Sequence, residues 1–465
     1  MIWGIFDMAW IKRIKGESKG GSKKKRVLVI GLDGVPYTFL THPKNAGKFP
    51  RMQELFQNGA FQRMRSVIPT ISSVAWSSFM TGRNPAKHNI YGFIDRKANP
   101  FEPFIPTASN MKSSTLWQIL SQAQKRVVVI NVPVTYPPKP VNGILVGCFL
   151  ATKLDKAAYP ASVVPKLKEL GYVIDVDAWL ARKDRKKFLE ELHVALDRRV
   201  ATARYFLEQE EWDFFQVHVM ETDRINHFFW EAWENGHPEF APEFIRYYQK
   251  IDDYVGQIHD QFVEQNPETE FILLSDHGFC SIRQEVFVNQ WLCEKGFLKF
   301  TGEKPDLKQM HPETTAYSLI PGRIFLNVRG REYCGRIEPG ENYEKTCQQL
   351  AGALMEMKDP ANGEPILDRV VRRDEIYHGP YLDQAADLVA VPRDGYDLKG
   401  NIDQTALTGR SELEGMHTYD DAFFYLKGKS VNETGFDIHA LAPTILKLMD
   451  VPIPADMDRG SLPVE

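Results

Sequence analysis

The sequence predicts an α/β protein with a mostly parallel central sheet, helices on both faces and additional cap insertions. The first observation is a series of short apolar runs rich in Val, Ile and Leu, which is typical of parallel strands buried on both faces. The second is that stretches with helical periodicity lie between these runs, as in repeated strand–helix units. The third is that several runs end in Asp, and ligands of such sheets bind at the carboxyl ends of the strands.

The clearest strand is the apolar run Arg26–Gly34, whose polar residue, Asp33, lies at the carboxyl end. Its apolar residues follow one another without alternation, as expected in the middle of a parallel sheet. Further runs of this kind are predicted strands: Val127–Val132, Gly143–Cys148, Phe214–Met220 and Phe271–Ser275, with later candidates at Arg323–Val328, Asp387–Val391 and Ala422–Leu426.

Helices are predicted between these strands, at Ser114–Gln124, Arg182–Glu208, Pro242–Glu264, Tyr343–Met357 and His439–Met449. Two segments do not fit the strand–helix pattern. Ala151–Lys187 is Lys-rich and weakly periodic, and Lys295–Gly322 is polar and contains three prolines. We expect one catalytic domain over residues 26–465, with insertions near 151–187 and 295–322 that form parts of a lid or cap.

Composition excludes several classes of protein. A chain of 465 residues with 43% hydrophobic and 25% charged residues is long enough for one large globular domain with insertions. The net charge of −4 argues against a protein that coats a nucleic acid polymer, although it is compatible with a nucleotide-sized substrate. The five cysteines form no CxxC pair, which favours a reducing compartment and a cytoplasmic location.

The first 25 residues differ from the rest of the chain. Met1–Trp10 is apolar, and eight basic residues follow between Lys12 and Arg26, whereas a signal peptide has its positive charge before the apolar run. One interpretation is a flexible basic tail. The other is a short interfacial segment that contacts a membrane surface, with aromatic rings among the headgroups and lysines on anionic lipid. No run approaches the roughly 18–20 apolar residues of a spanning helix.

Two pairs of residues have the chemistry of metal ligands. Asp223 and His227 are four positions apart, which places both on one face of a helix. Asp276 and His277 follow a buried strand, where an ionised carboxylate without a partner would cost several kcal/mol. A cation such as zinc or manganese would supply that partner, and His417 is a remote third ligand. Each of these residues taken alone also fits a structural role, as does Asp33.

The segment Ile68–Pro85 contains a candidate nucleophile. A short helix is predicted over Val74–Thr81, ended by Gly82. Ser72 and Ser73 both suit a helix N-cap. Alternatively, one hydroxyl lies on a metal and attacks phosphorus, with the helix N-terminus holding the phosphoryl oxygens. Both interpretations fit the local sequence.

Taken together, these motifs resemble the alkaline phosphatase superfamily, specifically its type I phosphodiesterase/nucleotide pyrophosphatase branch and related phosphohydrolases and phosphomutases. The resemblance extends from Arg26 to the C-terminus, and its motifs occur in the order of the family. The motifs are Leu32-Asp33-Gly34, Pro69–Pro85, Asp223-x-x-x-His227, Asp276-His277-Gly278, Gly415-x-His417 and Ala442–Leu446. The Cys-x-Pro-x-Arg signature of the sulfatase branch is absent.

The resemblance implies an alkaline-phosphatase-like fold and a site with two divalent metal ions, zinc or alternatively manganese. The family's ligands of one ion correspond to Asp33, Asp276 and His277, and the nucleophile also binds this ion. The family's ligands of the other ion correspond to Asp223, His227 and His417. Ser72 occupies the nucleophile position, with Ser73 as the alternative. Ala75 stands where nucleotide pyrophosphatases have a phosphate-binding Asn, so nucleotide specificity does not transfer.

The resulting expectation is a metal-dependent phosphohydrolase, foremost a phosphodiesterase with a phosphoserine intermediate that acts on a small phosphate ester or nucleotide-like substrate. One alternative is a phosphomutase or phosphotransferase, which a cap that excludes water would favour. The other is a non-catalytic protein that binds phosphorylated ligands. No nucleic acid polymer is expected as a partner, and no oligomeric state is favoured. Two further histidines, His88 and His218, are expected to be structural.

Overall fold

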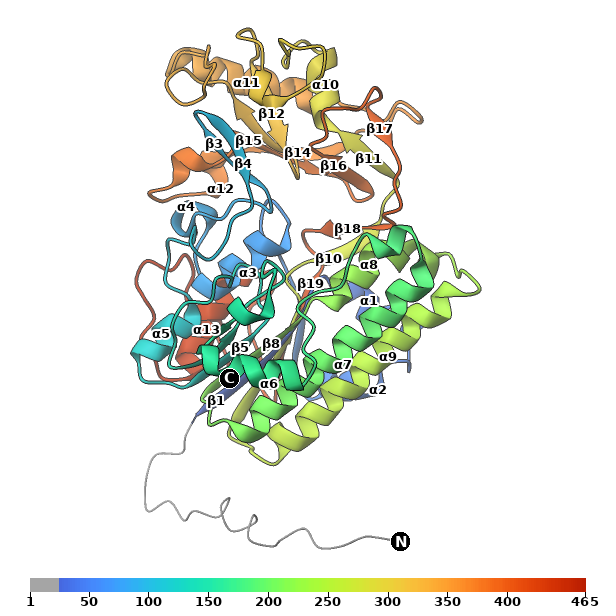
Figure 1. Ribbon diagram of the computed structural model, residues 1–465, viewed down its shortest axis with the longest axis vertical. Coiled ribbons are helices and arrows are strands. Elements are labelled where there is room, and N and C mark those ends of the chain that lie inside the picture. Colours follow the sequence, from blue (N-terminus) through green and yellow to red (C-terminus); the bar gives the residue numbers. More distant parts are fainter. Residues whose placement is uncertain (1–24) are drawn as a thin grey trace, which may run out of the picture.

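The computed structural model describes residues 25–465, and its centre is an eight-stranded sheet (Figure 1). The strand order is β2-β19-β9-β1-β8-β5-β6-β7, and the five strands from β9 to β6 are parallel. Antiparallel strands close both edges, so the predicted α/β class with a mostly parallel sheet is confirmed. The bounds are β1 Arg26–Leu32, β2 Gly59–Met64, β5 Val127–Ile130, β6 Gly143–Val146, β7 Ala158–Tyr159, β8 Phe214–Val219, β9 Thr269–Leu274 and β19 Ala422–Lys427.

Helices cover both faces of the sheet because its strands bury side chains on both sides. In β1, Leu28 and Ile30 belong to one hydrophobic core, whereas Val27 and Val29 belong to another. The first core is completed by α2 (Pro50–Gln57), α7 (Arg185–Gln209), α8 (Glu221–Glu234) and α9 (Phe240–Ile258). The second is completed by α3 (Ser72–Thr81), α5 (Leu116–Gln122) and α13 (Leu441–Leu448), on the opposite side in Figure 1.

Residues 284–409 form a second body above the carboxyl edge of the sheet (Figure 1). It has its own core, built on an antiparallel sheet in the order β12-β13-β15-β14 and on two helices. The runs predicted at 323–328 and 387–391 are strands of this sheet rather than of the central one. The bounds are β12 Ala316–Leu319, β13 Arg323–Leu326, β14 Leu367–Arg372, β15 Leu388–Pro392, α10 Val288–Glu294 and α11 Glu341–Met355.

The two segments expected to form a cap lie in different places. Residues 295–322 lie within the second body, which also contains a three-stranded sheet of β16 (Tyr396–Lys399), β11 (Gln284–Phe287) and β17 (Thr408–Gly409). Residues 151–187 lie against the central sheet instead: β7 pairs with β6, and α6 (Val164–Glu169) buries Val164 and Leu167 in the first core. Their weak periodicity reflects several short helical turns.

The expected tail or interfacial segment lies outside the described residues except for Lys25. Between residues 25 and 465, no helix combines the length and the apolar character needed to cross a bilayer.

Arg96 connects the β3–β4 hairpin (Asp95–Ala98, Phe101–Phe104) to the second body. Its guanidinium lies 2.7 Å from Glu332 and also bonds Tyr317, and the Arg96 and Glu332 side chains are 2% and 0% exposed. Arg96→Met is expected to lower the free energy of unfolding by about 3 kcal/mol, because it removes one partner of a buried ion pair. Urea denaturation measures this.

The matched control is Lys97→Met, whose ion pair with Glu102 is 64% and 56% exposed. Exposed pairs contribute little, so we expect a change below about 0.5 kcal/mol. Equal effects of the two substitutions would contradict a role for Arg96 in holding the two bodies together.

Candidate active site

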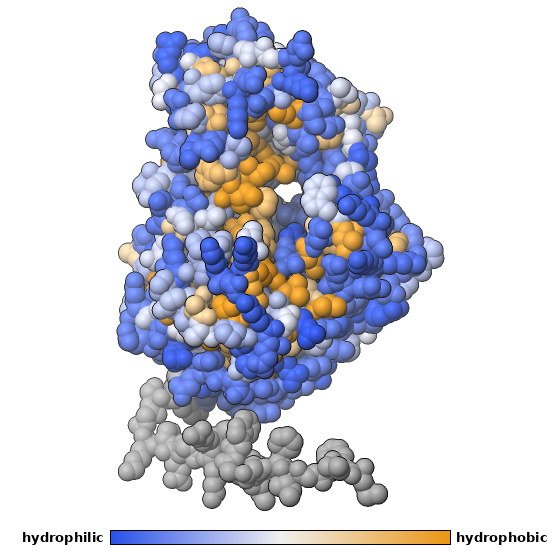
Figure 2. Space-filling view, in the orientation of Figure 1, coloured by the Kyte–Doolittle hydropathy of each residue, from blue (hydrophilic) through white to orange (hydrophobic). Residues whose placement is uncertain are grey.

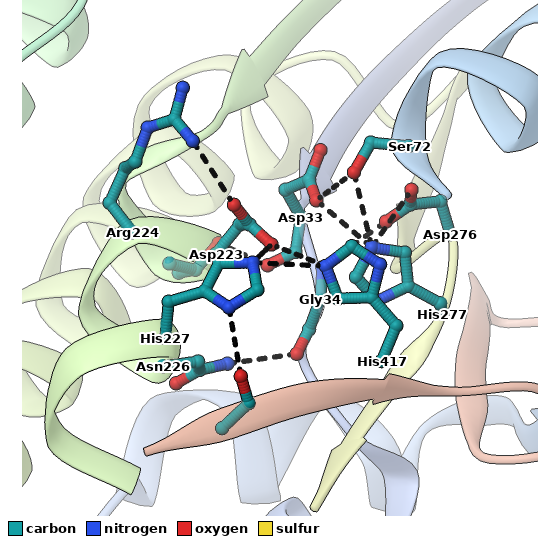
Figure 3. Close-up of polar contacts among 12 residues, drawn as sticks. Asp33, Gly34, Ser72, Asp223, Arg224, Asn226, His227, Asp276, His277 and His417 are labelled. Atoms are coloured by element: carbon teal, nitrogen blue, oxygen red, sulfur yellow. Dashed lines mark hydrogen bonds and ion pairs between the residues drawn. The ribbon is translucent and has the colours of Figure 1, made fainter. Parts of the chain in front are cut away.

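The seven predicted site residues meet at the carboxyl ends of the parallel strands (Figure 3). They come from five separate segments, because β1, β8 and β9 are neighbours in the sheet and end at the same edge. Asp33 follows β1, Ser72 is the first residue of α3, Asp223 and His227 lie on α8, Asp276 and His277 follow β9, and His417 lies on β18 (Gly415–Thr418).

The hydroxyl of Ser72 faces the first group of these side chains. Its Oγ lies 3.1 Å from Asp33 Oδ1 and 3.2 Å from Nε2 of His277. The helix begins with Ile71 as N-cap and no side chain caps it, so neither Ser72 nor Ser73 is the N-cap considered from the sequence. The Oγ of Ser73 is buried and bonds nothing within the described part of the chain. Ser72 is therefore the serine that faces the carboxylates.

The second group contains Asp223, His227 and His417. Asp223 Oδ1 lies 3.1 Å from Nε2 of His417 and 3.3 Å from Nε2 of His227. The two Nε2 atoms are only 3.1 Å apart. Two ring nitrogens that face each other at this distance beside a carboxylate need a proton or a cation between them.

The hydrogen bonds of the three imidazoles fix which nitrogen faces inward. Nδ1 of His227 lies 2.8 Å from the carbonyl of Gly415, and Nδ1 of His417 lies 3.2 Å from that of Thr70. Nδ1 of His277 lies 3.0 Å from the carbonyl of Gly278. Because a carbonyl only accepts, each Nδ1 carries the hydrogen and each Nε2 presents its lone pair to the site. Histidines that bind metals are oriented by hydrogen bonds of this kind.

The three carboxylates differ in their electrostatic environment. Burial alone would raise the pKa of Asp33, but the neighbouring imidazoles of His218 and His277 outweigh burial and hold that pKa well below its usual value. The pKa of Asp223 is likewise lowered, against its burial, by His227 and His417. Burial and the neighbouring charge of Asp33 raise the pKa of Asp276 well above the usual range. The imidazole of His277 lies 3.5 Å from Asp276 Oδ2 and does not offset these two effects.

The donor atoms of this site suit divalent cations. Ligand atoms of Asp223, His227 and His417 lie within 4.8 Å of one another, as do those of Asp33, Asp223 and His277. Asp276 Oδ1 accepts from the Gly34 amide at 3.1 Å, whereas its Oδ2 is buried without a hydrogen bond among the described residues. Mixed carboxylate and imidazole ligands fit zinc or manganese. A cation would also satisfy the unpaired oxygen of Asp276.

Two side chains that hold Asp33 in place were not expected from the sequence. Asp33 Oδ2 accepts from Nε1 of Trp76 at 2.9 Å and lies 2.7 Å from Nε2 of His218. Trp76 lies one helical turn after Ser72, so the spacing within α3 could have pointed to it. His218, which was expected to be only structural, lies opposite Gly31 in the β1–β8 register. His88 does have a structural environment: it is fully buried and contacts Ser78.

Gly34 allows the turn on which these contacts depend. Its φ is +65°, and a Cβ atom there would lie 2.9 Å from the ring of Phe279 and 3.0 Å from that of His277. Any side chain at this position would thus be strained and would displace a site residue.

Replacing His218 by Gln is expected to weaken metal binding about 10- to 100-fold, because the hydrogen bond that orients Asp33 is lost. Competition with a chromophoric chelator measures the affinity. The control is His88→Gln, which changes an equally buried histidine. Equal metal affinities of the two variants, with similar losses of stability, would mean that His218 only supports the fold.

The site opens into a cleft of about 830 Å³ between the two bodies. Its walls include Asp33, Ser72, Asp223, His227 and His417 on one side and residues of β15 and β16 on the other. Reacting groups therefore lie at the base of a space large enough for a small organic ester.

Comparison with known proteins agrees with this arrangement. The profile of the type I phosphodiesterase / nucleotide pyrophosphatase family matches residues 27–420. The chain belongs to this family. It is therefore a phosphoester hydrolase of the phosphodiesterase/pyrophosphatase type. No curated protein matches the chain in a sequence comparison.

Solved structures share the alkaline-phosphatase-like fold of this family member at low sequence identity. Phosphonoacetate hydrolase from Sinorhizobium meliloti 1021, in complex with phosphonoformate, aligns with a TM-score of 0.61 and 16% identity over 92% of this chain and 96% of its own. Murine ectonucleotide pyrophosphatase / phosphodiesterase 5 aligns with a TM-score of 0.56 and 15% identity over 94% and 98%. An inactive variant of the murine protein was solved in complex with AMP.

Proposed function

We propose that the protein is a metal-dependent phosphodiesterase that acts through a phosphoserine intermediate on two divalent cations. The observation that carries this proposal is the convergence of three imidazole lone pairs and three carboxylates beside the Ser72 hydroxyl. Cations explain this set of donors, because without them the buried Oδ2 of Asp276 has no hydrogen bond among residues 25–465.

Each cation would have its own side chains. Asp33, Asp276 and His277 would hold one ion together with Ser72, and Asp223, His227 and His417 would hold the other. When bound, zinc or manganese would lower the pKa of an oxygen ligand and offset the charge of the phosphoryl group. This arrangement is typical of in-line displacement at phosphorus.

Ser72 would act as the nucleophile. Its Oγ, which donates to Asp33 at 3.1 Å, would form a bond to phosphorus while the bond from phosphorus to the leaving ester oxygen breaks. The Ser72 hydroxyl loses one proton in this step, and the leaving oxygen takes up one proton to depart as the alcohol. Water then attacks the phosphoserine, which releases a phosphomonoester and restores the hydroxyl. The net reaction consumes one diester and one water and yields one monoester and one alcohol.

Arg224 would contribute the hydrogen-bond donor to phosphate that Ala75 cannot. Ala75 is fully buried in the second core. Arg224 lines the cleft, with its guanidinium 3.5 Å from Asp223 and 2.8 Å from Asp175. We assign it to the non-bridging oxygens of the substrate, since a guanidinium matches phosphoryl oxygens well.

Hydrolysis of a generic aryl phosphodiester by the zinc- or manganese-loaded protein tests the proposed function. Formation of the phosphomonoester with water as the acceptor supports a phosphodiesterase. With an added alcohol, a product that contains the alcohol in preference to water would favour the phosphotransferase alternative. A protein that binds the ester without turnover would favour the non-catalytic alternative.

We also propose a cytoplasmic location. All five cysteines are free thiols, which suits a reducing compartment. Controlled oxidation followed by an unfolding measurement tests this: a protein stabilised by disulfides would contradict it.

A further inference from the structure

The cleft beside the site is lined by apolar side chains that the hydrophobic cores do not use. Ile68, Phe93, Phe149, Ile320 and Val391 line it and are partly exposed. None of the five belongs to a core cluster of residues 25–465. Figure 2 shows apolar surface gathered along the groove between the two bodies. Exposed apolar surface that is continuous and recessed usually marks a ligand site.

These side chains come from both bodies, so apolar surface lines the cleft on both of its sides. Ile68 precedes α3, and the rings of Phe93 and Phe149 are stacked with centroids 5.9 Å apart. Ile320 follows β12 and Val391 lies on β15, both in the second body. The wall is continuous with the centre, because Ser72 and His417 line the same cleft.

Three of the four Arg and Lys side chains that line the cleft have acidic partners, and only Arg393 has none among residues 25–465. Lys399 lies 2.5 Å from Asp397, and Arg369 lies 2.7 Å from Asp368. Arg224 is paired with Asp175 and is the one cation that we assign to the phosphodiester itself. A ligand with several phosphates would have to compete with these carboxylates, whereas a phosphodiester carries a single negative charge. The charges therefore favour a substrate whose remaining bulk is apolar.

We propose that the cleft binds an aliphatic group of the substrate, so that the preferred substrates are phosphodiesters with one alkyl chain. The inference rests on the proposed function, because the phosphodiester must sit at Ser72. The alkyl chain then extends from the reacting phosphorus along Ile68, Ile320 and Val391. Each methylene that enters the cleft leaves water, which is the source of the selectivity.

The test is a series of 4-nitrophenyl alkyl phosphates with methyl, butyl and octyl groups, hydrolysed by the metal-loaded protein. All members share one leaving group, so differences in kcat/KM between them measure the effect of the alkyl chain length. We expect kcat/KM to rise by up to about fourfold per methylene until the cleft is filled. A series that does not rise, or a faster reaction with the 4-nitrophenyl ester of thymidine monophosphate than with the octyl ester, would overturn the inference.

Variants show whether the cleft causes the rise. Ile320→Asn and Val391→Asn should lower kcat/KM more for the octyl ester than for the methyl ester, which flattens the series. Ile105→Asn is the control, because Ile105 is 47% exposed and lies outside the cleft. An unchanged series in both cleft variants would place the alkyl selectivity elsewhere and overturn the assignment.

Binding of methyl-, butyl- and octylphosphonate, measured by calorimetry, separates this inference from the proposed function. If no diester is hydrolysed but affinity rises with chain length, the proposed function fails and the alkyl site stands. If diesters are hydrolysed but neither affinity nor kcat/KM depends on the chain, the alkyl site fails and the proposed function stands.

Discussion

Replacement of Ser72 by alanine is expected to reduce turnover of an aryl phosphodiester by ~10⁴-fold or more, because no covalent intermediate can then form. The substitution removes a single oxygen that faces Asp33 and His277 and leaves every other proposed ligand in place. The metal content should therefore stay near two ions per chain, and the unfolding midpoint should change little. Steady-state kinetics and elemental analysis measure the two quantities.

Ser73→Ala is the matched control, because the neighbouring hydroxyl is buried without a partner in the described part of the chain. Its removal should leave kcat within about threefold and should not destabilise the protein, since an unsatisfied polar group is lost. The reverse result, with an active Ser72→Ala and an inactive Ser73→Ala, would transfer the role of nucleophile to Ser73.

Removal of the metal ions by a chelator is expected to abolish activity, and zinc or manganese should restore it. Reloading should also release protons. In the metal-free protein, burial and Asp33 raise the pKa of Asp276, so Asp276 keeps its proton at a pH where an ordinary carboxyl has lost it. A cation favours the ionised form and displaces that proton.

Calorimetric titration of the metal in two buffers with different ionisation enthalpies counts the released protons. Asp276→Asn should release about one proton fewer, because its amide does not titrate in this range. Activity that persists in the fully metal-free protein would contradict the proposed mechanism. Equal proton release by the variant and the unmodified protein would assign the proton to another group.

The central sheet could be predicted because its strands are apolar without interruption. The runs near 323–328 and 387–391 have the same character and yet belong to the second body. Strands buried on both faces have the same sequence pattern in either sheet, so the pattern identifies strands but not their neighbours. The edge strand β2 was missed because Gln62 and Arg63 interrupt its apolar residues.

The convergence of the site residues was predictable for a related reason. Parallel strands that end in Asp bring those side chains to one edge of the sheet, as Asp33 and Asp276 demonstrate. The contact between His218 and Asp33 depends instead on which strands are neighbours and in what register, which a single sequence does not specify. Similarly, the apolar walls of the cleft come from segments that are far apart in the chain.

The chain passes from the body that contains the central sheet to the second body after β10 (Gly278–Ser281), and it returns just before β18. These two strands pair with each other, with Phe279 opposite His417. Both connections between the bodies therefore lie within a few residues of His277 and His417, whose rings stack 3.7 Å apart. A rotation of the second body about these connections would therefore displace His277 and His417, two of the proposed metal ligands.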